Sequence, residues 1–339
     1  MKEIVLLLTN EKGTSNYNES WKNVSIVELD AAIGLCLLAG VFHSRNQDLR
    51  ELWDEEVRMA RFRATMRINR FEEILQCMRF DDEATREERR ATDKLALISQ
   101  YFNLFVDNCK KNYIPDINII VDKQLYPWRG RAKHVKTYIP SKPDKYDYEL
   151  AQSLLSKHTT IIGTVRKSKP FLPKEMLPDK KREELSTIFG YNDKVAICSY
   201  LPKKNRAVIL MSTMHQDGIV SHMDQKKSEI ILEYNRTKGG VDNLNKLVRT
   251  YSSKRKTKRW KMVVFFNTLG IGALVIWLLI HPDWNKGKKH RRRLFLREIA
   301  YQLTEKQVNL RSNKPNLHKG IRRVIASCGY GITRGENNN

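Results

Sequence analysis

Apolar residues recur at helical spacing through the first third of the chain. The box Ser25–Glu28 combines a side-chain acceptor with a glutamate three residues later, which is typical of a helix start, and it opens the first such segment. The same periodicity predicts helices that begin at Asn69 and that cover about 94–112. Residues 81–93 are almost wholly charged and are expected to form an exposed connector, and Pro115 ends this helical block.

After this block the apolar runs become short and rich in β-branched residues. Ile117–Val121 is predicted to be a buried strand that ends at Asp122, and Ile161–Val165 a second strand. Val195–Tyr200 and Ala207–Met211 have the spacing of a β-hairpin. A carboxylate just beyond a buried strand is a common place for chemistry in α/β folds, and a turn-forming aspartate is the alternative interpretation.

The last third returns to a helical pattern. Gly239–Asp242 opens an amphipathic segment, and 293–303 is predicted to be the final helix. Between them Met262–Ile280 is 19 residues long, with Asn267 and Thr268 as its polar residues. That length suits a bilayer span, and the alternative is the central core helix of a soluble domain.

Positive charge is concentrated towards the end of the chain. The 339 residues include 62 Lys and Arg against 38 Asp and Glu, a net charge of +24, and the 41% that are apolar can bury a core. Residues 246–311 hold 17 Lys and Arg against 3 acids, a net +14. The runs at 254–259 and 286–293 favour nucleic acid as the partner, since clustered cations release counterions from phosphates. A solvated face and a membrane-surface patch are the alternatives.

Several other classes of protein are disfavoured by what the chain lacks. Its five cysteines lie 32–130 residues apart without a Cys-x-x-Cys pair, which argues against a disulfide scaffold and a local zinc finger. There is no Walker loop, no dinucleotide-binding glycine motif and no His-Glu-x-x-His. The apolar run Ile4–Leu8 is too short for the core of a signal peptide, so an intracellular setting is expected.

Short motifs in a fixed order carry a more specific signal. They lie at Leu52–Trp53, Asn69–Phe71, Arg79–Asp82, Val121–Leu125, Trp128–Arg131, Tyr138–Tyr146, Gly163–Arg166, Gly239–Leu244 and Lys256–Trp260. Together they resemble the piggyBac family of DNA transposases over residues 24–310. Met262–Ile280 is similar to a buried helix of that family, which favours the core helix over the membrane span.

The resemblance implies an α/β fold. It would consist of a truncated RNase H-like catalytic core with an insertion subdomain, plus a mostly helical dimerisation and DNA-binding domain built from N- and C-terminal segments. The implied boundaries are a loose N-terminus at 1–19, the helical domain at 20–115 and 246–311, the core at 116–175 and 230–245, the insertion at 176–229, and a flexible tail at 312–339. In the shortened core we expect Ile117–Val121 to pair directly with Ile161–Val165.

The family's chemistry depends on aspartates. Three of them hold two divalent ions such as Mg²⁺, which activate the attacking oxygen and stabilise the departing one. The resemblance makes Asp122 the first of the three and Asp242 the third, so both are implied catalytic residues and metal ligands. Asn245 stands where the family has a further aspartate, and its amide lacks the charge that a divalent ion needs.

The second catalytic aspartate is missing. Only 16 residues separate Tyr146 from Gly163, too few for the strands that carry this aspartate at about 3.3 Å per residue. Glu149 is the one acid placed to substitute, at what resembles a deletion seam. We therefore expect that Mg²⁺ is not productively bound. The family's cysteine-rich zinc-binding tail is also absent after Arg311, which puts recognition of transposon ends in doubt.

Three functional hypotheses follow. The first is a decayed or domesticated transposase-derived protein of the nucleus that binds DNA without cleaving it. The second is an active metal-dependent transposase, if the missing segment is a gene-model error. The third is a remnant whose core cannot close, because lost strands leave unpaired sheet edges. A homodimer is a possible assembly, and neither a membrane nor a small-molecule substrate is expected. The predicted DNA contacts are Arg129, Arg131, Lys254, Arg255, Lys256, Lys258 and Arg259.

Overall fold

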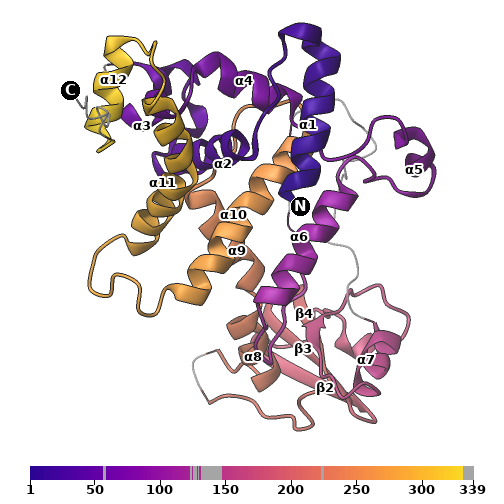
Figure 1. Cartoon of the computed structure of the whole chain (residues 1–339). Helices are drawn as coiled ribbons and strands as arrows, with labels where there is room; N and C mark the ends of the chain where they lie inside the picture. The colour runs from indigo at the N-terminus through magenta and orange to yellow at the C-terminus, as the bar shows by residue number, and fades with distance from the viewer. Residues whose placement is uncertain are drawn as a thin grey trace. The chain divides into compact units, whose positions relative to one another are not determined.

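The computed structural model describes residues 1–55, 59–122, 124, 128, 130, 147–222 and 225–330 (Figure 1). The chain divides into two compact units. The helical unit comprises Met1–Ile119, Lys123–Lys136 and Leu244–Asn339, and the sheet unit comprises Ile120–Asp122 and Thr137–Asn243. The structure as a whole is mixed α/β, mostly helical, with one four-stranded antiparallel sheet in its described part.

The helical unit is built around one large apolar core. Its helices are α1 (Lys2–Tyr17), α2 (Ile26–Val41), α3 (Ala60–Thr65), α4 (Ile68–Cys77), α5 (Arg86–Thr92), α6 (Ser99–Asn112), α10 (Trp260–Ile280), α11 (Arg291–Ser312) and α12 (Lys319–Ser327). The Ser25 hydroxyl accepts from the backbone N–H of Glu28 at 3.1 Å, so the predicted N-cap of α2 is confirmed. Leu35 and Leu38 of α2 are completely buried, and α11 packs along this helix.

Both ends of the described chain are helical, where we expected loose segments at 1–19 and 312–339. In α1, the Asn10 side chain donates to the Val24 carbonyl at 3.0 Å and accepts from the Val24 N–H at 2.7 Å. At the other end, Ile325 of α12 is buried against α3 and α11. These expectations were wrong for 2–17 and 319–327, because the partners that bury both helices are remote in sequence and invisible to local periodicity.

The sheet unit contains β1 (Ile162–Thr164), β2 (Ser186–Asn192), β3 (Val195–Lys203) and β4 (Arg206–Ser212), with α7 (Tyr148–Leu155) and α8 (Glu229–Thr237). The strand order is β1-β4-β3-β2, antiparallel throughout, with Gly163 opposite Met211 and Cys198 opposite Leu210. The predicted hairpin is therefore confirmed. Alternate residues of β3 enter two separate apolar clusters, one that includes α7 and one that includes α8.

The predicted strand at 117–121 does not form. Ile117 is 93% exposed and Ile119 72% exposed, and β1 pairs with β4 instead of with this segment. Both the burial and the pairing expected from the β-branched run were therefore wrong. A run of this composition fits a strand only where an open sheet edge accepts it, and the sequence pattern cannot specify that edge.

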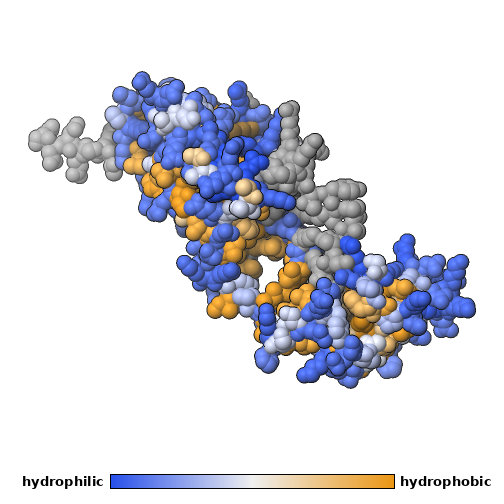
Figure 2. Space-filling model, turned by 90° about the vertical axis from the view of Figure 1, so that its right-hand side faces the viewer, coloured by the Kyte–Doolittle hydropathy of each residue, from blue (hydrophilic) through white to orange (hydrophobic). Residues whose placement is uncertain are grey.

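The apolar helix α10 is a core element over its first half. Phe265 and Phe266 are buried in the helical core, and Thr268 shares a 2.9 Å hydrogen bond with the Tyr101 hydroxyl. By length and composition α10 is also the one helix of the described part that could cross a membrane, and 33% of its most apolar window is buried. Figure 2 shows a largely hydrophilic surface with apolar residues gathered in patches.

Candidate functional site

The two family aspartates lie on segments that touch within the sheet unit. Asp242 stands exposed in the first turn of α9 (Gly240–Thr250), and Asp122 is half-buried at the end of the irregular segment. The Ile120 side chain packs so closely on Gly240 that a Cβ there would lie 2.3 Å from the Ile120 Cδ1 atom. Glycine at 240 therefore permits this approach, and the contact brings together the segments that precede Asp122 and Asp242.

The described residues do not fit a two-metal centre. They contain no group of three or more His, Cys, Asp or Glu side chains arranged to hold an ion. Glu149, the candidate substitute, lies exposed on α7. Two close divalent ions need several carboxylate oxygens around them, and Asp122 with Asp242 supplies too few.

Hydrogen bonds join three side-chain amides, of which Gln124 lies shortly after Asp122 in the sequence and Asn245 shortly after Asp242. Gln124 Nε2 donates to Asn245 Oδ1 at 2.7 Å, and Asn267 Nδ2 donates to Gln124 Oε1 at 3.0 Å. Asn245 lies on α9 and Asn267 on α10, and all three side chains are half-buried in the helical unit. Sequence reasoning noted Asn245 as a lost charge and missed its hydrogen-bonded role, because only the fold brings Gln124 and Asn267 to it.

The basic stretch 254–259 divides into structural and surface cations. The Arg255 guanidinium is buried and donates to the carbonyls of Ser44 at 2.7 Å and Gln47 at 3.1 Å. Arg259 donates to the Leu75 carbonyl at 2.8 Å and also to Met78.

Burial lowers the pKa of both groups, in Arg259 to about 10. These two arginines satisfy carbonyls beyond the ends of α2 and near the end of α4, so the structure gives them another role than the predicted DNA contact.

Lys256 and Lys258 are the exposed cations of this stretch. Lys254 is half-buried, and its pKa is lowered by desolvation and by the nearby charge of Arg45. Arg129 and Arg131, which were also predicted to contact DNA, lie outside the described residues.

We expect Arg255→Met to lower the unfolding temperature, because two carbonyls lose their donor at a cost of about 1–3 kcal/mol. The matched variant with both Lys256→Ala and Lys258→Ala should unfold within about 0.5 kcal/mol of wild type per site. Circular dichroism melts measure both. Equal stability of the Arg255 variant and wild type would show that this guanidinium is free for a ligand.

A second basic surface lies at the turn between α10 and α11. Lys286, Lys288 and Lys289 are exposed on the turn, and Arg293 and Arg297 are exposed on α11. Within the described chain none of the five forms an ion pair. We call this surface the basic turn. The sequence shows it as a run of charges, but the sequence does not distinguish it from the partly buried run at 254–259.

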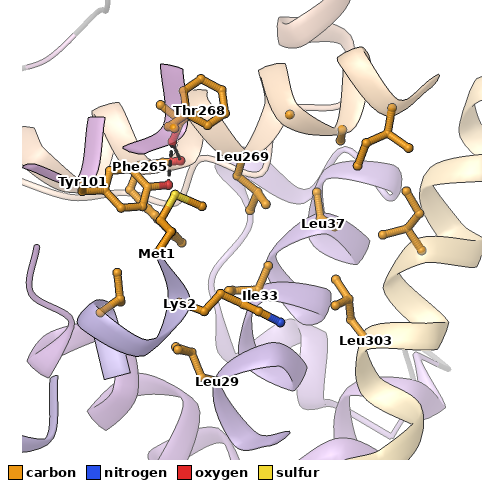
Figure 3. Close-up of a pocket in the computed structure, with 16 residues that line it drawn as sticks. Met1, Lys2, Leu29, Ile33, Leu37, Tyr101, Phe265, Thr268, Leu269 and Leu303 are labelled. Carbon is orange, nitrogen blue, oxygen red and sulfur yellow. Dashed lines mark hydrogen bonds between the residues drawn. The ribbon is translucent and has the colours of Figure 1, made fainter. Parts of the chain in front are cut away.

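The helical unit also contains an apolar cavity of about 290 Å³ (Figure 3). Leu29, Ile33, Leu37 and Phe265 contribute to its walls. Burial raises the pKa of the Tyr101 phenol at its edge to about 12. The lining is mostly apolar, and the charged residue in it, Lys2, forms an ion pair with Asp30 at 2.7 Å, so we do not take this cavity as a candidate catalytic site.

Comparison with known proteins accounts for this combination of features. A solved structure described as a piggyBac transposase synaptic complex with hairpin DNA superimposes with a TM-score of 0.87 over 98% of this chain and 84% of that chain, at 23% identity. The family model named Transposase IS4, of the DDE type, matches residues 2–150 and 146–277. Because these matches cover most of the sequence, the chain belongs to the Transposase IS4 family of DDE transposases, whose chemistry uses divalent metal.

Proposed function

We propose that this protein is a piggyBac-like, transposase-derived DNA-binding protein that does not cleave DNA. The proposal rests on two observations. The basic turn has exposed cations without ion pairs, and the described residues contain no group of three side chains that could hold a metal ion. Cations on a surface are sufficient to bind phosphates, whereas cleavage needs a complete metal centre.

The family match supports the loss of a catalytic segment. It comes in two parts that meet at residues 146–150, next to the shortened stretch between Tyr146 and Gly163. In this proposal the sheet unit corresponds to a truncated RNase H-like core with its insertion, and the helical unit to the dimerisation and DNA-binding domain. A protein that binds chromosomal DNA would act in the nucleus.

The charge distribution supports DNA as the partner. The similar solved structure contains DNA, and the net charge of this chain is +24. The exposed cations of the basic turn and Lys256 and Lys258 lie in the part of the chain with the largest excess of positive charge, so phosphate contacts there should dominate the affinity.

The test is a supercoiled-plasmid assay with Mg²⁺ or Mn²⁺ across a salt series, run with wild type and Asp122→Asn. We expect retarded plasmid, unchanged in topology for both proteins and released as salt rises. Nicking that disappears in the Asp122 variant would establish a working metal site and overturn the proposed inactivity.

The basic turn makes a second arm of this experiment. Replacing Lys286, Lys288 and Lys289 by Ala should weaken duplex binding by about 10-fold or more and flatten the salt slope by about 2–3. The charge-matched control replaces Lys203, Lys204 and Arg206, exposed at the β3–β4 turn of the sheet unit, and should bind nearly as wild type. Equal losses of DNA affinity in the two triple variants would show that the basic turn is not the binding surface.

An active transposase is the second candidate, because the break in the family match at 146–150 is also what an incorrect gene model would produce. Sequencing the transcript between the codons for Tyr146 and Gly163 decides this. An uninterrupted short message rejects the active form, and an additional segment with an aspartate would restore it.

A further inference from the structure

Two hydrogen bonds between uncharged side chains join Gln124 to Asn245 and to Asn267. The carboxamide oxygen of Asn245 accepts from the Gln124 side-chain amide at 2.7 Å. Gln124 in turn uses its oxygen for the Asn267 amide at 3.0 Å. Each of the two hydrogen bonds therefore has one donor and one acceptor, and together they link Asn267 on α10 through Gln124 to Asn245 on α9.

The residues that precede the two aspartates make an apolar contact in the sheet unit. There Ile120 packs directly on Gly240, with no polar group in the contact. Ile120 precedes Asp122 by two residues and Gly240 precedes Asp242 by two, and the amide chain begins two residues after Asp122. Each aspartate is thus preceded by an apolar contact and followed by an amide contact.

We propose that this amide chain, and not a divalent ion, holds Gln124 against α9 and α10, with Gln124 as the central positioning residue. The proposal rests on the proposed function only in taking Asp122 and Asp242 as the family aspartates. A metal-dependent link would need charged oxygens as ligands, whereas the two hydrogen bonds observed here join uncharged amides.

The direction of the two bonds makes the proposal sharply testable. Asn245 acts as an acceptor, so Asn245→Asp keeps a suitable oxygen for Gln124 and should be tolerated. Asn267 acts as a donor, so Asn267→Asp places a carboxylate against the Gln124 oxygen and should lower the unfolding temperature by about 3–6 °C. Asn103→Asp, on an exposed position of α6, is the control for the added charge and should leave the unfolding temperature unchanged.

Two further readouts separate positioning by these bonds from a general effect of substitution. The deficit of Asn267→Asp should shrink as the pH falls below about 4, because a protonated carboxyl group can again donate to Gln124. Wild type should melt at the same temperature in excess EDTA and in millimolar MgCl₂ or MnCl₂, since an ion that bound the native state would raise that temperature by mass action.

The outcomes are decisive in both directions. Failure of Asn267→Asp to fold while Asn245→Asp folds supports the proposal as strongly as the expected difference. Equal effects of both variants, the reverse ranking, or stabilisation of wild type by Mn²⁺ would overturn it. None of these melts contains DNA, so a protein that shows the expected ranking yet fails to bind plasmid would refute the proposed function alone.

Discussion

Asp81→Asn is expected to reduce the unfolding free energy of the helical unit by about 3–5 kcal/mol. The Asp81 side chain is completely buried and accepts from Arg86 Nε at 2.7 Å, with Arg89 Nη2 at 3.4 Å and Lys261 Nζ at 3.5 Å. Loss of the carboxylate leaves Lys261, itself only 8% exposed, as a buried cation without its compensating charge.

Urea unfolding followed by far-UV circular dichroism measures this loss. The neighbouring Asp82→Asn is the matched control, because Asp82 is exposed and asparagine keeps one oxygen that can accept from the Ala84 N–H. We expect the control to change stability by about 1 kcal/mol or less. Equal losses at both positions would show that burial of Asp81 is not what matters.

The same cluster predicts a pH dependence. Desolvation lowers the pKa of Lys261 to about 8, despite the opposing attraction of Asp81. The unfolded chain binds this proton more tightly than the folded one, so the ionised lysine costs stability below pH 8. That cost is relieved as the pH rises from about 8 to about 10.5. The Lys261→Met variant should lack this component, and parallel pH profiles of variant and wild type would contradict the assignment.

Gly40→Ala should destabilise the helical unit by about 1–3 kcal/mol, although alanine is ordinarily the better helix residue. A Cβ at Gly40, in the last turn of α2, would lie 2.5 Å from the Tyr251 carbonyl oxygen and 3.1 Å from backbone atoms of Ser252 and Ser253. Backbone cannot rotate away as a side chain can, so the segment leading to the basic stretch must move.

The control is the same substitution in another helix. A Cβ at Gly272 of α10 would meet Phe105 Cε2 at 3.5 Å, an ordinary van der Waals contact. Gly272→Ala should therefore gain about 0.5–1 kcal/mol from reduced freedom of the unfolded chain. Thermal melts of the two variants should shift in opposite directions, and a shift of the same sign would refute the packing argument.

Sequence motifs identified the family, because short residue patterns keep their order along the chain whatever the tertiary structure; the roles of Asp122 and Asp242 stay a prediction. Helical periodicity located α2, α4 and α6 for a similar reason, since it is a local property, and α10 was visible as a long apolar run. The hairpin of β3 and β4 was found from two apolar runs and the turn between them, all of which are local.

The candidate site was predicted less completely. Arg255 and Lys256 look alike in the sequence, yet the first donates to the Ser44 carbonyl and the second is exposed. Likewise, the donor for Asn245 comes from Gln124, 121 residues away. Charge and residue type can be read along the chain, but the partner of each group depends on contacts between remote segments.

The sequence by itself determined the family, the excess of positive charge and those helices whose periodicity or apolar length is visible locally, because each is a property of composition, of local spacing or of the order of short motifs. Only the tertiary structure decided that Ile117–Val121 stays outside the sheet and that 2–17 and 319–327 are docked helices. It also decided which basic residues donate to carbonyls and which are exposed. The physical reason is that burial and hydrogen-bond satisfaction depend on neighbours remote in sequence, which local patterns do not encode.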